Sequence, residues 1–275
     1  MLRRLEAAMR DLLHPRHRAT LARFAGTSGE ASVLLAFDYD GVLAPLVKAP
    51  GGSRMRRRTR ALLVRLCRLY PVAVVSGRAW KDTRRLSEGV VPHVVGNHGF
   101  ELLHPVPVPR ETLRTVRTWR RRLEADLAGV PGLHFEDKRS TLAIHYGLST
   151  AWRRAERSVY EAANRLEGTR LIPGKKVLNV LPHDFPNKGD AIRSLLARLG
   201  LTAALYAGDD VTDEDAFRLG SPLVLGVHIG AGPSLAPWRV EAQAGVDELL
   251  GRLVALREPR GRAPPRRRAG ARRGR

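Results

Sequence analysis

The chain has 275 residues, 43% of them hydrophobic and only 5% aromatic, so leucine, valine and alanine must fill one large core or two smaller ones. No apolar run approaches the roughly 20 residues that span a bilayer, and the single cysteine, Cys67, excludes an internal disulfide. We therefore expect a cytoplasmic protein without membrane association. The net charge of +21 is partly concentrated in residues 257–275, which hold nine arginines and one glutamate.

The chain begins with a pattern that predicts a helix and a linker in residues 1–30. Apolar residues recur at helical spacing over 2–13, and Pro15 ends the pattern. Residues 33–102 then alternate short apolar strands with amphipathic helices. The predicted strands are 33–37, 72–75 and 94–96, and the predicted helices are 56–70 and 80–86. This order is typical of a doubly wound, Rossmann-like parallel sheet.

The pattern changes after residue 102. We predict two helices and four strands there: 111–127, 133–137, 141–146, 152–166, 170–172 and 176–181. Strands adjacent in sequence favour an antiparallel sheet, so residues 103–185 read as an inserted α+β domain. The parallel pattern then resumes with elements at 188–199, 203–207, 213–219, 223–227 and 246–256. The core therefore comprises 31–102 plus 186–256.

The last segment, residues 257–275, lacks apolar periodicity and is expected to be disordered. Its arginines could contact RNA or acidic surfaces nonspecifically. Alternatively, the basic tail is only a by-product of the arginine-rich composition of the chain. We expect no specific nucleic-acid partner.

Two aspartates follow the first buried strand. Side chains repeat every two residues in an extended strand, so Asp38 and Asp40 can project to one side at its carboxyl end, where open α/β sheets bind ligands. Two carboxylates in one place repel unless a cation lies between them. Taken alone, the same residues are equally compatible with a solvated turn.

Further polar groups follow other strands or open a helix, and all suit phosphoryl transfer. They are Ser76-Gly77-Arg78, Asn187-Lys188-Gly189-Asp190 and the acidic run from Gly208 to Asp215. A carboxylate can attack phosphorus, and a second carboxylate can protonate the leaving oxygen. A hydroxyl and a lysine can stabilise the phosphoryl oxygens, and Mg²⁺ can neutralise their charge.

With these four motifs in order, the chain resembles the haloacid dehalogenase superfamily and, within it, the trehalose-6-phosphate phosphatase family. Additional matches are Leu43-Ala44-Pro45 and Gly96-Asn97-His98-Gly99-Phe100-Glu101. The resemblance covers roughly residues 31–250. It implies a phosphatase core with a cap domain inserted between the second and third motifs.

The resemblance also implies roles for the core residues. Asp38 would be the nucleophile and a Mg²⁺ ligand, and Asp40 the general acid and base with its backbone carbonyl on the metal. Ser76 and Gly77 would bind the phosphoryl group, and Lys188 would neutralise it. Two further residues complete the implied metal set, Asp209 directly and Asp213 through water or supporting contacts.

Substrate contacts are implied on both sides of the site. Arg78 would reach substrate or form a structural ion pair, and Asn97 and His98 would face the sugar or only shape a turn. In the cap, Glu136, Lys138 and Ser140 occupy alternate positions, so an extended strand would aim all three at one face, toward the sugar. One departure stands out: the family has an acid and an arginine where this chain has Asn179 and Leu181.

The implied activity is a Mg²⁺-dependent phosphoric monoester hydrolase acting on trehalose 6-phosphate as a monomer, in trehalose biosynthesis. A sibling phosphatase for sucrose phosphate or a glycosyl-glycerate phosphate is the nearest alternative, because Asn179 and Leu181 change the cap. A polyanion-binding protein on a degenerate phosphatase fold and a phosphoryl-transferring mutase are more distant alternatives. The intact Asp38, Asp40, Lys188 and Asp209 argue against degeneration.

Overall fold

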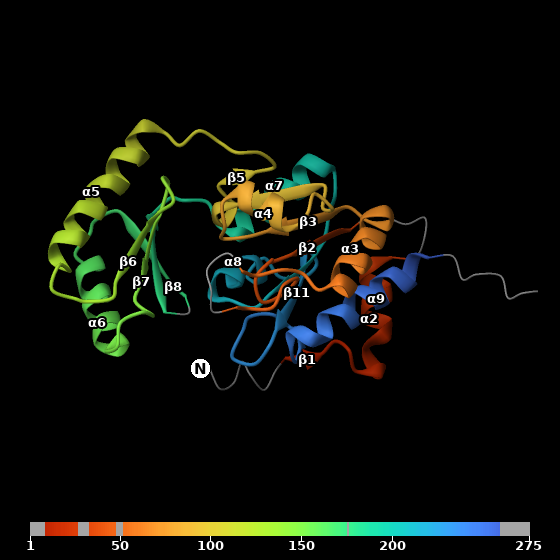
Figure 1. Ribbon diagram of the computed structural model, residues 1–275. Coiled ribbons are helices and arrows are strands. Elements are labelled where there is room, and N and C mark those ends of the chain that lie inside the picture. The colour runs from red at the N-terminus through yellow and green to blue at the C-terminus, as the bar shows by residue number, and fades with distance from the viewer. Residues whose placement is uncertain (1–8, 27–32, 48–51, 175, 259–275) are drawn as a thin grey trace, which may run out of the picture.

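The computed structural model describes residues 9–26, 33–47, 52–174 and 176–258, which form two sheets with their helices (Figure 1). The larger sheet has eight strands in the order β1-β12-β11-β10-β2-β3-β4-β5. All neighbouring pairs are parallel except β4 with β5. The strands are β1 (Arg10–Asp11), β2 (Leu34–Phe37), β3 (Val72–Val75), β4 (His93–Gly96), β5 (Glu101–Leu102), β10 (Ala204–Gly208), β11 (Val224–Ile229) and β12 (Trp238–Val240).

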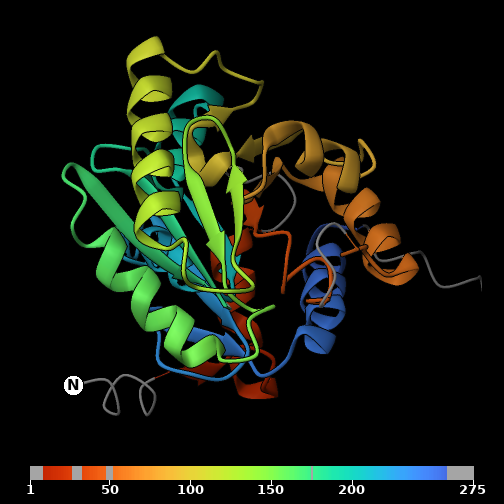
Figure 2. The same ribbon diagram turned by 60° about the vertical axis from the view of Figure 1, so that its left-hand side comes forward.

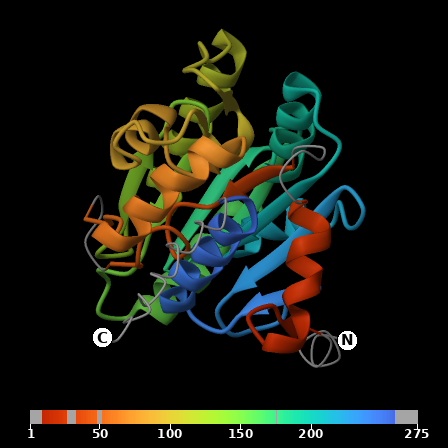
Figure 3. The ribbon, with the colours of Figure 1, turned by 90° about the vertical axis from the view of Figure 1, so that its right-hand side faces the viewer.

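Helices cover both faces of this sheet. One face packs against α2, α3 and α9, which lie in front of the sheet in Figure 3, and the other face packs against α7 and α8. The helices around this sheet are α2 (Arg18–Ala25), α3 (Arg57–Leu69), α4 (Trp80–Leu86), α7 (Lys188–Leu199), α8 (Glu214–Phe217) and α9 (Val246–Arg257).

The continuous apolar run of β2 follows from this double cover. Leu35 and Phe37 belong to the core on the α3 and α9 side, whereas Leu34 and Ala36 belong to the core on the α7 side. Since successive side chains point to opposite faces, a strand covered on both faces needs apolar residues at every position. The predicted α/β class with a mainly parallel, doubly wound sheet is thus confirmed.

The second sheet and two helices form a unit that we call the four-stranded unit (residues 110–182). Its antiparallel order is β6-β7-β9-β8, and α5 and α6 pack on one face of it (Figure 2). Its elements are α5 (Arg110–Asp126), β6 (His134–Asp137), β7 (Leu142–His145), α6 (Trp152–Ala163), β8 (Thr169–Gly174) and β9 (Val177–Pro182).

The predicted helix over residues 2–13 is wrong where the structure describes it. Arg10–Asp11 form β1, because Arg10 N–H donates to the Pro237 carbonyl (3.1 Å) and Leu12 N–H to that of Arg239 (2.9 Å). Leu12 is fully buried in the core, and the helix of this region is α2. Pairing with β12 thus overrides the helical spacing of the leucines.

Other differences concern short elements. The strands β5 and β12 were not predicted, because two or three residues show no periodicity. The predicted helix over 213–219 is a 3-10 turn (Val211–Asp213) followed by the short α8. The expected linker beyond Gly26 and the tail beyond Glu258 lie outside the described residues. Within the described part of the chain, no helix has the length and apolar character needed to cross a membrane.

Candidate active site

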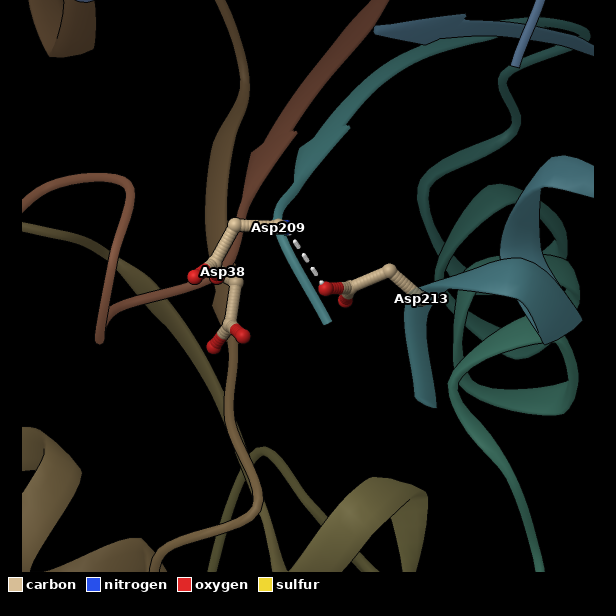
Figure 4. Close-up of side chains that lie close together, drawn as sticks. All are labelled: Asp38, Asp209 and Asp213. Carbon is tan, nitrogen blue, oxygen red and sulfur yellow. Dashed lines mark hydrogen bonds between the residues drawn. The ribbon is translucent and has the colours of Figure 1, made fainter. Parts of the chain in front are cut away.

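The fold places two aspartates side by side where the strand order reverses direction. Asp38 directly follows β2 and Asp209 directly follows β10, and these strands pair in parallel. The chain continues from β2 to β3 on one side, while β10 lies on the other, so this is the switch point where doubly wound sheets bind ligands. Asp213 joins them: one carboxylate oxygen of each lies within 4.8 Å of the others (Figure 4).

Glycine makes this close approach possible. Gly41 has a φ of +76°, and a Cβ there would overlap the Asp209 carboxylate. Gly208 plays the same part for Asp213, since a Cβ at that position would overlap its carboxylate. The glycines beside both acidic motifs therefore leave room for the carboxylates.

Lys188 is fully buried between two of the acids. Its Nζ donates to Asp38 Oδ2 at 2.8 Å and to Asp213 Oδ1 at 2.7 Å. Although burial lowers its pKa, the charges of Asp213 and Asp38 raise the pKa of Lys188 above its usual value. The ammonium therefore stays charged and balances part of the acidic cluster.

Asp213 is surrounded by donors on all sides. Its Oδ1 accepts from Lys188 and from the Tyr206 hydroxyl (2.5 Å), while its Oδ2 accepts from the N–H groups of Asp209 (2.9 Å) and Asp210 (2.8 Å). Two carboxylate oxygens offer about four acceptor sites, so these donors use them all. Asp213 thus holds Lys188 and the Asp209 loop in place, which fits the expected supporting contact.

Tyr206 was missed by sequence reasoning. It is fully buried on β10, two residues before Gly208, and its hydroxyl contacts Asp213. Its only signal was a polar hydroxyl within an apolar strand, and a buried tyrosine hydroxyl needs a partner.

The other two carboxylates are not fully neutralised by protein groups. Burial raises the pKa of Asp38 to about 7, against the opposing effect of Lys188. Burial and the charges of Asp38 and Asp213 raise the pKa of Asp209 to about 8. Buried carboxylate oxygens with excess negative charge are the donor set of a hard divalent cation. The residues present therefore fit Mg²⁺.

Asp40 lies beside this cluster but forms a different contact. The Arg78 guanidinium holds its carboxylate with two hydrogen bonds, Nε to Oδ2 at 2.5 Å and Nη2 to Oδ1 at 2.8 Å. Both side chains are about a quarter exposed (28% and 26%). Of the two roles predicted for Arg78, the structure shows the ion pair.

Ser76, Gly77 and the loop after β4 form one wall of the site. Ser76 is buried, and its Oγ accepts the N–H of Arg78 (3.2 Å). A Cβ at Gly77 would lie 2.5 Å from His98 Cε1, so the glycine lets the imidazole pack against the backbone. The motif therefore supplies a tight turn as well as a hydroxyl.

Asn97 and His98 are buried in a strained turn. Their φ values are +47° and +56°, a left-handed conformation that is costly without glycine. Asn97 Oδ1 and His98 Nδ1 have no hydrogen-bond partner among the described residues. Burial, followed by the charges of Lys138, Lys188 and Arg170, holds the pKa of His98 well below its usual value. The neutral ring therefore lies within reach of three cations.

The predicted substrate-binding residues of the four-stranded unit, Glu136, Lys138 and Asn179, have different surroundings. Burial and the charge of Arg78 lower the pKa of Lys138, while the charges of Glu136 and Asp40 oppose the shift. Glu136 Oε2 pairs with His145 Nε2 at 2.9 Å. Asn179 Nδ2 donates to the Ile172 carbonyl at 3.4 Å. His145 and Arg170 were not among the predicted site residues.

Comparisons with known protein sequences point to one family. The family model described as trehalose-phosphatase matches residues 36–241. The trehalose-phosphate phosphatase of Mycobacterium avium is 33% identical over 196 residues, covering 66% of this chain and 49% of that protein. The corresponding protein of Mycobacterium marinum is 30% identical over 239 residues, covering 80% and 60%.

This chain thus spans about half the length of the first of those relatives. Among solved structures, the C-terminal domain of the C. albicans trehalose-6-phosphate phosphatase matches with a TM-score of 0.73. The match covers 86% of this chain and 96% of that one at 21% identity, which supports the fold.

Proposed function

The chain belongs to the trehalose-phosphatase family, and we propose that it is a Mg²⁺-dependent phosphatase that hydrolyses trehalose 6-phosphate to trehalose and inorganic phosphate. The observation that carries the proposal is the placement of Lys188 between Asp38 and Asp213, with Asp209 beside them at the switch point of the sheet. A nucleophilic carboxylate, a buried cation and further carboxylate ligands are what phosphoryl transfer needs.

Asp38 would attack phosphorus and form an aspartyl-phosphate while the bond from phosphorus to the sugar oxygen breaks. Its Oδ2 accepts from Lys188 and its Oδ1 accepts the N–H of Tyr39 at 2.6 Å, so its orientation is fixed before substrate binds. Lys188 would then stabilise the phosphoryl oxygens as their charge develops. Mg²⁺, held by Asp38, Asp209 and the backbone carbonyl of Asp40, would neutralise the phosphoryl charge.

Asp40 would protonate the departing sugar oxygen and later take the proton of the water that attacks the aspartyl-phosphate. Its carboxylate is held by two hydrogen bonds from the Arg78 guanidinium. The substrate phosphate is a competing anion for the same guanidinium. Binding of substrate would thus draw Arg78 toward the phosphate and leave Asp40 free to carry a proton.

The four-stranded unit would act as the cap: Glu136 and Asn179 lie in one cross-strand row of its sheet, on the face opposite the α5 and α6 core. The expectation that one extended strand also carries Lys138 and Ser140 is wrong, because β6 ends at Asp137 and both residues lie in the turn that follows. Lys138 has no ion-pair partner among the described residues and is electrostatically coupled to Arg78 and Asp40. These polar side chains would bind sugar hydroxyls, with Asn97 and His98 on the opposite wall. We also place the protein in the cytoplasm as a monomer.

Replacing Asp38 by asparagine tests the mechanism. Asp38→Asn keeps the shape of the side chain but removes the nucleophile and a metal ligand, so turnover of trehalose 6-phosphate should fall to background while the melting temperature changes little. Asp82→Asn, at an exposed position of α4, is the matched control and should retain activity. Substantial turnover by Asp38→Asn would contradict the proposal.

A sibling substrate is the second candidate, and the cap supports it. Leu181 is fully buried against Ile172 and Phe185, so no charge projects from that position, and Asn179 brings an amide in place of a carboxylate. Comparing kcat/KM for trehalose 6-phosphate, sucrose 6-phosphate and a phosphorylated glycosyl glycerate discriminates between the two. The highest value identifies the substrate.

A further inference from the structure

Arg170 connects the cap sheet to the segment that leads into the catalytic lysine. Its side chain lies on β8, and its Nη2 donates to the backbone carbonyls of Phe185 (3.0 Å) and Pro186 (3.4 Å). That segment carries the chain from β9 back to α7, and Lys188 is the first residue of α7. The guanidinium therefore contacts the backbone two residues before the lysine.

An apolar cluster fixes the same segment from the side. Ile172, Leu181 and Phe185 are buried together, and Phe100 stacks on Phe185 with ring centroids 4.9 Å apart. We call these four residues the hinge cluster. Leu181 is the cross-strand partner of Arg170, so the arginine and the cluster hold the segment together.

The start of α7 is also fixed from the core side. The Asn187 side chain accepts the N–H of Asp190 (3.0 Å), and the Asp190 carboxylate accepts the N–H of Asn187 (3.1 Å). The Asn187 carbonyl lies so close to Gly99 that a Cβ there would be 2.5 Å away. Between these contacts and the hinge cluster, the backbone carbonyls of Phe185 and Pro186 are held by Arg170.

We infer that Arg170 is a positioning residue for Lys188: by binding the Phe185 and Pro186 carbonyls from the cap sheet, it sets where α7 begins and thus where the ammonium meets Asp38. The inference rests on the proposed function for its kinetic test. A displacement of about 1 Å at a catalytic group is enough to reduce turnover about 100-fold. Loss of the Arg170 contact, two residues before Lys188, can therefore reduce kcat.

The competing interpretation is a direct substrate contact. Arg170 is close enough to the site for its charge to act on His98, and its Nε is buried without a partner among the described residues. A direct contact would matter only for substrates that reach the cap. Positioning of Lys188 would matter for every phosphate ester, which makes the two separable.

The test compares Arg170→Met with Arg165→Met, a control in the same unit whose arginine is exposed and pairs with Asp126. We measure kcat and KM with trehalose 6-phosphate and with p-nitrophenyl phosphate, which has no sugar hydroxyls. Arg170→Met should lower kcat about 10- to 100-fold for both substrates. Arg170→Lys, which keeps a charged donor, should recover part of the loss, and Arg165→Met should behave as wild type.

Hydrogen exchange gives a readout that does not depend on activity. If Arg170 fixes the segment, Arg170→Met should accelerate amide exchange within 187–191 relative to Arg165→Met, even in a protein that lacks phosphatase activity. An inactive wild type would therefore refute the proposed function, while exchange would still report on the contact.

Two outcomes would overturn the inference. One is a loss restricted to trehalose 6-phosphate with p-nitrophenyl phosphate unchanged, which identifies a substrate contact. The other is unchanged exchange at 187–191 together with unchanged kcat. Should Arg170→Met fail to fold, the milder variants Arg170→Lys and Arg170→Gln provide both measurements. Wild-type kcat together with wild-type exchange in both variants would then count against a positioning contact from Arg170.

Discussion

At the scale of single residues, the site is governed by how buried charges are shared. Asp213 uses all its acceptor positions on protein donors, and Lys188 divides its donors between Asp213 and Asp38. Asp38 and Asp209 keep raised pKa values, because their burial is not fully compensated. Asp213, which organises the site, is therefore distinct from the two acids that we propose as cation ligands, Asp38 and Asp209.

Tyr206 offers a direct measure of this organisation. Tyr206→Phe removes the hydroxyl that donates to Asp213 Oδ1 at 2.5 Å. Hydrogen bonds to charged groups contribute about 1.5–3 kcal/mol, so we expect a loss of that size in the free energy of unfolding, measured by urea denaturation.

The matched control is Tyr70→Phe, whose buried hydroxyl donates to the neutral Leu253 carbonyl at 3.0 Å. It should lose only about 0.5–1.5 kcal/mol. Equal losses in the two variants would show that the charge on Asp213 does not strengthen the Tyr206 hydrogen bond.

At the scale of elements, the turn after β2 and the end of β10 must fit each other. Gly41 combines a left-handed φ with direct contact to Asp209, so two requirements fall on one position. The turn therefore controls the position of the Asp209 carboxylate as well as the direction of the chain.

Gly41→Ala should separate these requirements when it is compared with Gly89→Ala. Gly89 has a similar φ of +66° but nothing within 4 Å of an added Cβ. Gly89→Ala should lose about 1–2 kcal/mol of stability from its left-handed backbone and keep full activity. Gly41→Ala should also displace Asp209 and lower kcat about 100-fold. If Gly41→Ala and Gly89→Ala have comparable kcat values when both are assayed well below their melting temperatures, the role of Gly41 is contradicted.

Sequence patterns predicted long elements and failed on short ones for physical reasons. The strand at 33–37 and the helix at 188–199 can be predicted from local sequence alone. The strand is an unbroken run of apolar residues, and Asn187 caps the start of the helix. β1 depends on pairing with β12, more than 220 residues away along the chain. Tertiary hydrogen bonds decided that segment, and no local pattern contains them.

The site shows the same division. The sequence placed Asp38, Lys188, Asp209 and Asp213 at strand ends and at a helix start, and the structure brings these four residues together. The ion pair of Arg78 with Asp40 and the contact of Arg170 with Phe185 depend on side-chain placement across separate elements. The residue types alone are compatible with several roles for Arg78 and Arg170, and the contacts seen in the folded structure are needed to distinguish these roles.

At the scale of the whole molecule, the proposed Mg²⁺ site would link cation binding to stability. Mg²⁺ that binds the folded chain but not the unfolded one adds about 2.7 kcal/mol at 100 times its dissociation constant. For a chain of this size that corresponds to a rise of about 5–10 °C in melting temperature. We expect this shift in a thermal melt with and without Mg²⁺.

Asp209→Asn should abolish the shift and, without Mg²⁺, melt above wild type because one of the repelling carboxylates is gone. Asp215→Asn, whose carboxylate pairs with Arg218 nearby, should respond to Mg²⁺ as wild type does. A full Mg²⁺ shift in Asp209→Asn would place the ion elsewhere.

The stack of Phe100 on Phe185 has a consequence for how this architecture diversifies. Phe100 lies just before β5, and Phe185 lies between β9 and α7, so the stack holds together the two segments that flank the four-stranded unit. An insertion whose ends meet can be exchanged without stretching its host. We therefore expect that a relative's insertion, grafted between β5 and Phe185 in place of residues 103–184, would carry its sugar preference to this chain and leave the large sheet unchanged.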